Sequence, residues 1–221
     1  MAYQSFPWQE GDSKSFEKLK ALQLPKLVGK KVLDIGCNTG FFCGYSEFCK
    51  AKYVLGIDKN ESFIGEAKKL FPNSTFECKD WSELDDTKYD IILFLSAIHY
   101  AQDQEQSINF LMDHLENNGK LILEIGIAPG IENDFATVIR NVGDKRLFPT
   151  FTKMHNILSK FSYTYIGPSI NQSGDPIPRH VYHIMHRNED QNFNINKEKQ
   201  FSLFLMKKFI ELNKSKFTSN K

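Results

Sequence analysis

Apolar residues occur along this chain in short runs that alternate with segments of helical period. Residues 91–95 are an unbroken apolar run, which is typical of a parallel strand covered on both faces. Farther along, Ile108, Leu111, Met112 and Leu115 recur at the spacing of one helix face. The same alternation predicts strands at 30–35, 53–58, 75–79, 90–96 and 120–126, and helices at 41–50, 62–70 and 104–115. A turn is expected at Asn118–Gly119.

Strands that alternate with helices favour right-handed crossovers and a parallel sheet. We therefore predict an α/β fold, a Rossmann-like doubly wound sheet of five parallel strands with helices on both faces. The pattern changes after residue 126, where an irregular stretch reaches to about residue 149. A helix at 152–160 follows, and residues 161–166 and 180–186 predict a C-terminal antiparallel hairpin.

The two ends of the chain differ from this central part. Residues 1–28 form an expected N-terminal cap, with Tyr3, Phe6 and Trp8 before a helix that Asp12 or Ser13 can begin. Residues 29–187 form the α/β domain. Residues 188–221 read as a polar linker and an amphipathic helix, which either packs on the domain or serves as an oligomer or partner surface.

Composition limits the classes of function. The 221 residues suit one α/β domain, and the formal net charge of +1 gives no support to nucleic-acid binding by charge alone. No apolar run is long enough to span a bilayer, and the N-terminus lacks the pattern of a secretory signal. The four cysteines form no Cys-x-x-Cys pair, so we expect no metal site and reduced thiols in a cytoplasmic protein.

The turn after the first strand carries the chemical signal, in the pattern Asp34-x-Gly36-x-x-x-Gly40. A dinucleotide-binding turn has glycine where Asp34 stands, because a diphosphate must approach a helix N-terminus there. A carboxylate repels a diphosphate and attracts a cation, which favours S-adenosylmethionine over NAD as the cofactor. Asp58, at the end of the second strand, is placed to bind both hydroxyls of a ribose.

Residues 32–42 resemble the first motif of the class I S-adenosylmethionine-dependent methyltransferases, and the similarity extends over residues 30–126. The resemblance implies that residues 29–187 form a methyltransferase domain that binds S-adenosylmethionine. It implies that the two glycines admit the cofactor to the backbone, that Asp34 binds its amino group, and that Asp58 binds its ribose. It also implies that Asp80 binds the adenine amino group and that Trp81 covers the ring. The expected cofactor-binding residues are Asp34, Gly36, Cys37, Asn38, Gly40, Asp58, Asp80 and Trp81.

Each assignment has a structural alternative. The glycines can be plain turn residues, and Asp58 can be a helix cap. Asp80 can be a solvated loop acid, and Trp81 can be a packing residue.

The acceptor is expected beyond the carboxyl ends of the strands. His99 follows the fourth strand, and a neutral imidazole suits the removal of a proton from a hydroxyl near pH 7. Its alternative is a histidine that hydrogen-bonds a loop. Candidate substrate-binding residues are Tyr100, Glu124, Arg179 and His180. Glu124 can equally pair with Arg179, and polar residues of the last strand can face solvent.

The acceptor class rests on three further observations. The fourth strand ends in Ser96-Ala97-Ile98-His99 and not in the Asn-Pro-Pro-Tyr type of run that marks methylation of bases or amides. In the irregular stretch, Arg140, Lys145 and Arg146 can receive a phosphate or carboxylate, or form an ordinary solvated loop. The Gly11-Asp12-Ser13 and 174–178 segments are similar to bacterial methyltransferases linked to surface-polysaccharide assembly.

The sequence therefore predicts a methyltransferase that acts on an oxygen of a small molecule, a sugar or phosphorylated sugar among the candidates. Methylation of RNA or protein is the alternative, with an RNA-binding patch from Lys145, Arg146, Lys153, Lys207 and Lys208. A non-catalytic partner subunit that uses the C-terminal helix is another. An NAD-dependent oxidoreductase is disfavoured by the glycine spacing.

Overall fold

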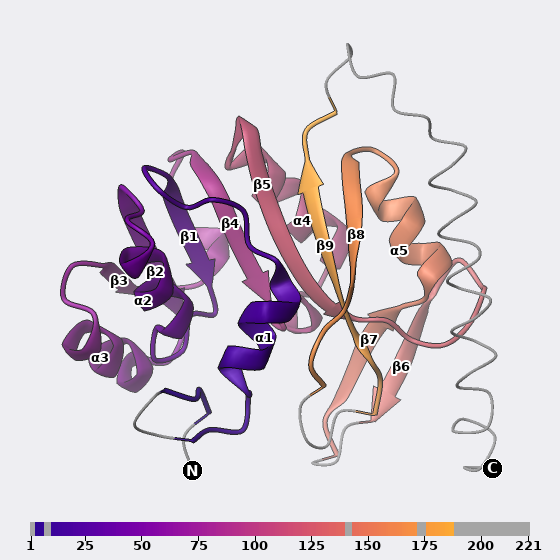
Figure 1. The fold of residues 1–221 in the computed structure, drawn as a ribbon. Helices are drawn as coiled ribbons and strands as arrows, with labels where there is room; N and C mark the ends of the chain where they lie inside the picture. The colour runs from indigo at the N-terminus through magenta and orange to yellow at the C-terminus, as the bar shows by residue number, and fades with distance from the viewer. Residues whose placement is uncertain (1–2, 7–9, 140–142, 172–175, 188–221) are drawn as a thin grey trace.

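A seven-stranded sheet in the order β3-β2-β1-β4-β5-β9-β8 organises the chain (Figure 1). The computed structural model describes residues 3–6, 10–139, 143–171 and 176–187. The strands of the sheet are β1 (Lys31–Ile35), β2 (Tyr53–Asp58), β3 (Thr75–Cys78), β4 (Tyr89–Leu95), β5 (Leu115–Gly126), β8 (Ser162–Pro168) and β9 (Arg179–Met185). β1 to β5 are parallel, β9 is antiparallel to β5, and β8 is antiparallel to β9. The predicted fold class is confirmed.

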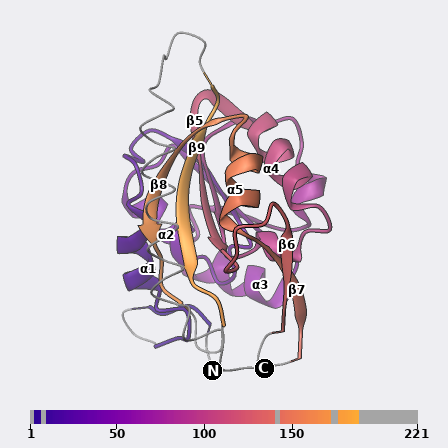
Figure 2. The same cartoon turned by 90° about the vertical axis from the view of Figure 1, so that its right-hand side faces the viewer.

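Helices cover both faces of this sheet, because its strands carry apolar side chains on both sides. On one face of the sheet, Leu22, Cys43 and Ile64 pack with Val32 in one buried cluster. On the other face, Leu111 belongs to a second buried cluster. The helices are α1 (Ser15–Leu22), α2 (Phe41–Phe48), α3 (Glu61–Leu70), α4 (Gln104–Asp113) and α5 (Phe151–Leu158), with short 3₁₀ turns η1 (Trp81–Glu83) and η2 (Ile98–Tyr100). Figure 2 shows α1 and α2 on one side of the sheet and α4 and α5 on the other.

The parallel strands end along one edge of the sheet, where two further segments lie. The arrows of β1 and β4 point to this edge, and the N-terminal segment and the β6–β7 hairpin lie near it (Figure 1). The hairpin consists of β6 (Phe135–Ile139) and β7 (Lys145–Pro149), paired antiparallel. It occupies the stretch that we expected to be irregular. That expectation was wrong because the two strands are short and partly solvent-exposed, which weakens their hydrophobic pattern.

Three smaller expectations were also wrong. β5 starts at Leu115, so Asn118–Gly119 lies within a strand whose register against β4 shifts, and not in a turn between elements. The residue before α1 is Lys14 in a left-handed conformation, with no side-chain cap, because the Ser13 hydroxyl hydrogen-bonds the Ser15 hydroxyl. β9 lies between β5 and β8, so its polar residues do not stand on an edge strand.

A buried ion pair fastens α1 to the carboxyl edge of the sheet. Lys18 of α1 is 3% exposed and its Nζ lies 2.9 Å from Oε2 of the fully buried Glu124 in β5. The same Nζ donates to the Ser96 hydroxyl at 3.3 Å, directly after β4. The hydroxyls of Ser96 and Ser169 both donate to the Glu124 carboxylate. α1 therefore places a charged side chain, Lys18, and an apolar side chain, Leu22, in the protein interior.

Two expectations reach beyond this description. The amphipathic helix at 197–212, with its use as an oligomer or partner surface, and the aromatic Trp8 lie outside the described residues. Among the helices that the structure does describe, none combines the length and the apolar character that a bilayer span requires. All four cysteines have free thiols.

Gly56 of β2 allows β3 and α2 to pack closely against it. A Cβ on this β2 residue would lie 2.7 Å from the Phe76 ring and 2.8 Å from Cys43 Sγ. We expect Gly56→Ala to lower the free energy of unfolding in urea by about 1–3 kcal/mol through overpacking. Gly65→Ala is the matched control, since no atom lies within 4 Å of its Cβ position in α3. It should stabilise by about 0.5–1 kcal/mol, and equal effects of the two variants would contradict this account.

Removal of the Lys18 charge should leave Glu124 buried without its nearest cation. We expect Lys18→Met to lower the free energy of unfolding by about 3–5 kcal/mol, the usual cost of breaking a buried pair. Lys20→Met, on the exposed side of the same helix, should change it by less than about 0.5 kcal/mol. Adding Glu124→Gln to Lys18→Met should restore much of the loss in urea denaturation. A double variant no more stable than Lys18→Met alone would argue against a charge effect.

Candidate functional site

The turn between β1 and α2 adopts a backbone that few residues accept. Gly36, Asn38 and Gly40 have φ angles of +70°, +51° and +86°. Glycine adopts this region freely, and asparagine is one of the few other residues that do. The N–H groups of Gly36 and Cys37 both donate to the Ile57 carbonyl of β2, at 2.9 and 3.0 Å. The turn is therefore fixed to the neighbouring strand.

Asp34 lies in β1 directly before the turn and is 2% exposed. The Cys43 thiol, from α2, lies 3.5 Å from its Oδ2 and is a weak donor. Burial is the largest cause that raises the pKa of Asp34 to about 7; the Cys43 thiol lowers it, the Asp58 carboxylate raises it, and Lys18 lowers it. Near neutral pH, Asp34 is thus a buried acid whose charge depends on what lies beside it.

Asp58 ends β2 and connects the turn to the following helix. Its Oδ2 accepts from the Asn38 N–H at 2.9 Å, and its Oδ1 accepts from the Asn60 N–H at 2.9 Å. The cap of α3 is Asn60, whose side chain accepts from the N–H groups of Ser62 and Phe63. Asp58 is therefore not the helix cap, and it lies with the turn as the sequence predicted.

Asp80 follows β3 and is held by two residues. Its Oδ1 accepts from the Ser82 N–H and hydroxyl at 2.8 and 2.6 Å, and Lys59 Nζ lies 2.5 Å from its Oδ2. Partial burial acts to raise the pKa of Asp80, but Lys59 and Ser82 together outweigh it and lower the pKa. Trp81 packs edge-on against Phe94, with ring centroids 5.4 Å apart, and the Lys59 ammonium lies 5.6 Å from its ring.

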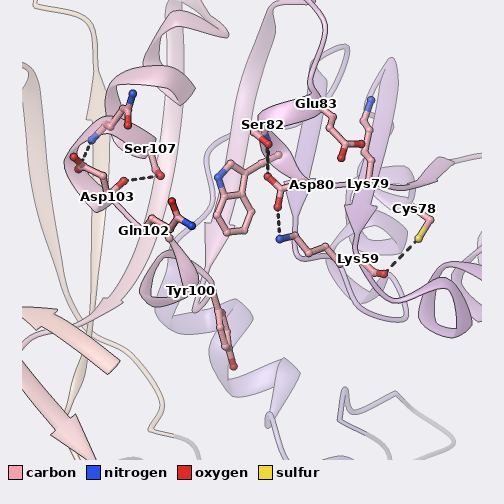
Figure 3. Close-up of a pocket in the computed structure, with 13 residues that line it drawn as sticks. Lys59, Cys78, Lys79, Asp80, Ser82, Glu83, Tyr100, Gln102, Asp103 and Ser107 are labelled. Carbon is pink, nitrogen blue, oxygen red and sulfur yellow. Dashed lines mark hydrogen bonds and ion pairs between the residues drawn. The ribbon is translucent and has the colours of Figure 1, made fainter. Parts of the chain in front are cut away.

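A pocket of about 710 Å³ opens beside these residues. Lys59, Asp80 and Trp81 line it on one side, and Tyr100 and Gln102 line it from η2 and the loop that follows (Figure 3). The pocket thus brings two predicted cofactor-binding residues, Asp80 and Trp81, together with Tyr100, which was predicted to bind the substrate. Asp34, Asp58 and the glycine turn lie at the adjoining strand ends and do not line this pocket.

Gln4 contacts the turn directly, and sequence reasoning missed it. Its Nε2 donates to the Cys37 carbonyl at 3.1 Å. Its Oε1 accepts from the Phe41 N–H and the Thr39 hydroxyl, both at 3.0 Å. A single glutamine in a segment without a periodic pattern carries no signal in the sequence, so only the folded chain shows this contact.

His99 lies in η2, just past the end of β4, and is 5% exposed. Its ring stacks on Phe148 of the β6–β7 hairpin, with centroids 5.4 Å apart and planes at 30°. The Tyr100 ring centroid lies 4.3 Å away on the same turn. His99 therefore stands at the predicted strand end, enclosed by the hairpin.

Glu124 and Arg179 belong to the buried network that includes Lys18. Arg179 Nη1 lies 3.9 Å from Glu124 Oε2. Burial acts to raise the pKa of Glu124, but Lys18 and then Arg179 outweigh it and lower the pKa. His180 lies apart from them, with Nδ1 3.0 Å from the Tyr165 hydroxyl and its ring against Phe151. Burial lowers the pKa of His180 to about 4, so it is neutral at pH 7.

The arrangement fits a nucleoside cofactor with a cationic group better than it fits a metal ion. Within the described part of the chain, no three His, Cys, Asp or Glu side chains gather as a metal site would require. Asp34, Asp58 and Asp80 instead mark the ends of three strands that are adjacent in the sheet.

Comparison with known proteins agrees with this geometry. A methyltransferase domain family model matches residues 26–171. A protein of Invertebrate iridescent virus 6, provisionally named methyltransferase 235L, is 30% identical over 158 residues, which cover 69% of this chain and 57% of that protein. The tRNA U34 carboxymethyltransferase of Hahella chejuensis is 28% identical over 134 residues, which cover 57% of this chain and 41% of that enzyme.

The fold has close counterparts among solved structures. An S-adenosylmethionine-dependent methyltransferase from Mesorhizobium loti superposes with a TM-score of 0.60 at 19% identity, covering 76% of this chain and 97% of that one. This likeness supports the fold, and the family match covers more than half of the chain. The chain therefore belongs to the methyltransferase domain family, as its resemblance to the class I S-adenosylmethionine-dependent enzymes predicted.

Proposed function

We propose that this protein transfers a methyl group from S-adenosylmethionine to an oxygen of a small molecule, a sugar or phosphorylated sugar being the leading candidate. The observation that carries the proposal is the set of carboxylates at three adjacent strand ends, with an imidazole at the end of the fourth. S-adenosylmethionine, when bound, supplies a methyl group on a positively charged sulfur. The chain's task is to bind it, to orient the acceptor and to remove one proton.

The cofactor half of the site follows from the three acids. Asp34 in its ionised form attracts the amino group of the methionine part. Asp58 already accepts two backbone N–H groups, which fixes its carboxylate for the ribose hydroxyls. Asp80, oriented by Ser82 and Lys59, is placed for the adenine amino group, and Trp81 offers a ring face or edge beside it.

The acceptor half depends on His99. A hydroxyl that becomes an ether must lose its proton, and a neutral imidazole at a strand end can accept it. Ring contacts with Phe148 and Tyr100 hold the imidazole in place, which supports in-line positioning of the acceptor oxygen. The oxygen acceptor is favoured because this strand end carries an imidazole and not an Asn-Pro-Pro-Tyr type of run.

Transfer to RNA is a second candidate, because several relatives are named tRNA U34 carboxymethyltransferases. One of the basic residues that could form an RNA patch is partly neutralised in the structure, because Lys153 Nζ lies 3.8 Å from Glu105 Oε2. Lys207 and Lys208 lie outside the described residues. The chain spans only about half of these relatives' length or less, so we rank this candidate second.

The raised pKa of Asp34 predicts a pH-dependent affinity for the cofactor. Below pH 7 the acid is largely protonated, and binding of a cationic amino group must expel that proton. We expect the affinity for S-adenosylhomocysteine, measured by calorimetry, to fall by up to about tenfold per pH unit below 7 and to level off above it. Asp34→Asn should weaken binding and flatten this slope, whereas Asp90→Asn, at the amino end of β4, should retain it. A slope that survives in Asp34→Asn would contradict the assignment.

Methyl transfer itself is tested with a tritium-labelled donor and a panel of sugars, phosphosugars and phenols. We expect protein-dependent labelling of at least one hydroxyl acceptor. His99→Gln should lower kcat by about 10²–10⁴-fold, the usual contribution of a general base, with little change in S-adenosylhomocysteine affinity. His186→Gln, near the opposite end of β5, is the control. Labelling of tRNA but of no small molecule would replace this proposal by the second candidate.

A further inference from the structure

One strand of the β6–β7 hairpin presents two side chains to the site. Arg146 and Phe148 are two residues apart in β7, so they point to the same face of the hairpin. Phe148 stacks on His99, and the guanidinium carbon of Arg146 lies 4.6 Å from the centre of the Tyr100 ring. Gln104 Nε2 donates to the Leu147 carbonyl at 2.8 Å, which fixes β7 against the start of α4. The two contacts are therefore parts of one docked face.

The Arg146 guanidinium is held in a definite orientation. Its central carbon Cζ lies over the Tyr100 ring, within the range of a favourable cation–π contact. Its Nε donates to Asp144 Oδ2 at 2.8 Å. A guanidinium has five N–H donors in a rigid fork, and this pairing uses the one on Nε. Together, the two contacts orient the guanidinium. The hydrogen bond to Asp144 uses Nε, so the terminal nitrogens Nη1 and Nη2 take no part in it.

Tyr100 connects this cation to the pocket. It lines the pocket together with Asp80 and Trp81, and 53% of its surface is exposed. Its neighbour His99 faces the other side chain of the hairpin, Phe148. Two side chains on one face of β7 thus contact two neighbouring residues of η2, Arg146 contacting Tyr100 and Phe148 contacting His99.

We propose that Arg146 binds an anionic group, a phosphate or a carboxylate, on the methyl acceptor. The inference rests on the proposed function of the site and narrows its substrate class. The acceptor would carry its anionic group toward Arg146 and its reacting hydroxyl toward His99. A hexose 6-phosphate and a hydroxybenzoate both carry an anionic group and a separate hydroxyl. Arginine suits the role because its fork binds two oxygens of such a group at once.

The neighbouring cations are less suited to this role. Lys145 is exposed and alternates to the opposite face of β7. Lys153 lies 5.3 Å from the centre of the Phe135 ring and near Glu105, so it stabilises the outer side of the hairpin. Lys145 therefore offers a matched control, because its removal changes the net charge of the hairpin by the same amount as removal of Arg146.

The first arm of the test uses catalysis. Matched acceptor pairs, glucose with glucose 6-phosphate and phenol with 4-hydroxybenzoate, are offered with the labelled donor. We expect wild-type protein to prefer the anionic member. Arg146→Ala should lower kcat/KM for that member by about 10–100-fold, chiefly through KM, in keeping with a lost charge-assisted contact. Arg146→Lys should recover only part of this, and Lys145→Ala should match wild type.

The second arm measures binding without turnover. Glucose 6-phosphate, glucose and inorganic phosphate are titrated into the S-adenosylhomocysteine-bound protein, and the Arg Nε–Hε NMR signals are followed. A shift with the two phosphate compounds that is lost in Arg146→Ala and retained in Lys145→Ala supports the inference, even where no acceptor is methylated. Equal responses of the two variants, or equal responses to glucose and its phosphate, would overturn it. Failure of the proposed function shows separately, as absent labelling of every acceptor.

Discussion

Two buried acids at the carboxyl edge of the sheet are treated in opposite ways, and the site depends on that difference. Glu124 contacts a lysine, an arginine and two hydroxyl donors, which lower its pKa despite complete burial. Asp34 has a thiol beside it and a more distant Lys18, and burial raises its pKa to about 7. A buried carboxylate without a full partner is costly to ionise. The fold therefore neutralises Glu124, whereas under the proposed function a cationic group of the cofactor would neutralise Asp34.

The local parts of the fold could be predicted from the sequence, because each depends on a short pattern. Apolar runs identified the parallel strands, and Asp34, Gly36, Gly40 and Asp58 lie where their spacing placed them. The parts that could not be predicted depend on contacts between distant residues. Lys18 reads as a polar residue of an amphipathic helix, yet its partner Glu124 lies more than a hundred residues away. Contacts with η2 and α4 hold the β6–β7 hairpin in place. Because these contacts are made by few residues, the hairpin's own strands show only a weak hydrophobic pattern.

The same division separates the two halves of the proposed site. The proposed cofactor residues stand at the ends of β1, β2 and β3. His99 is placed by the end of β4, but its surroundings are set by the β6–β7 hairpin, which joins β5 to α5. A shared fold does not determine the substrate, and the loops at the strand ends are where specificity can differ between members of one family. The hairpin is thus the segment in which to seek the identity of the acceptor.

Gln4 gives an independent reason why this turn suits a cationic donor and not a dinucleotide. In a dinucleotide-binding fold, the N–H groups at the start of the helix meet the diphosphate. Here Gly40 provides no side-chain cap for α2, and the side-chain amide oxygen Oε1 of Gln4 accepts the Phe41 N–H at that position. The amide nitrogen of the same side chain donates to the Cys37 carbonyl, which closes the turn from the other side. A neutral amide thus occupies the place of the diphosphate, while a few residues away the Asp34 carboxylate favours a positive charge. The two features come from distant parts of the sequence and select the same sign of ligand charge.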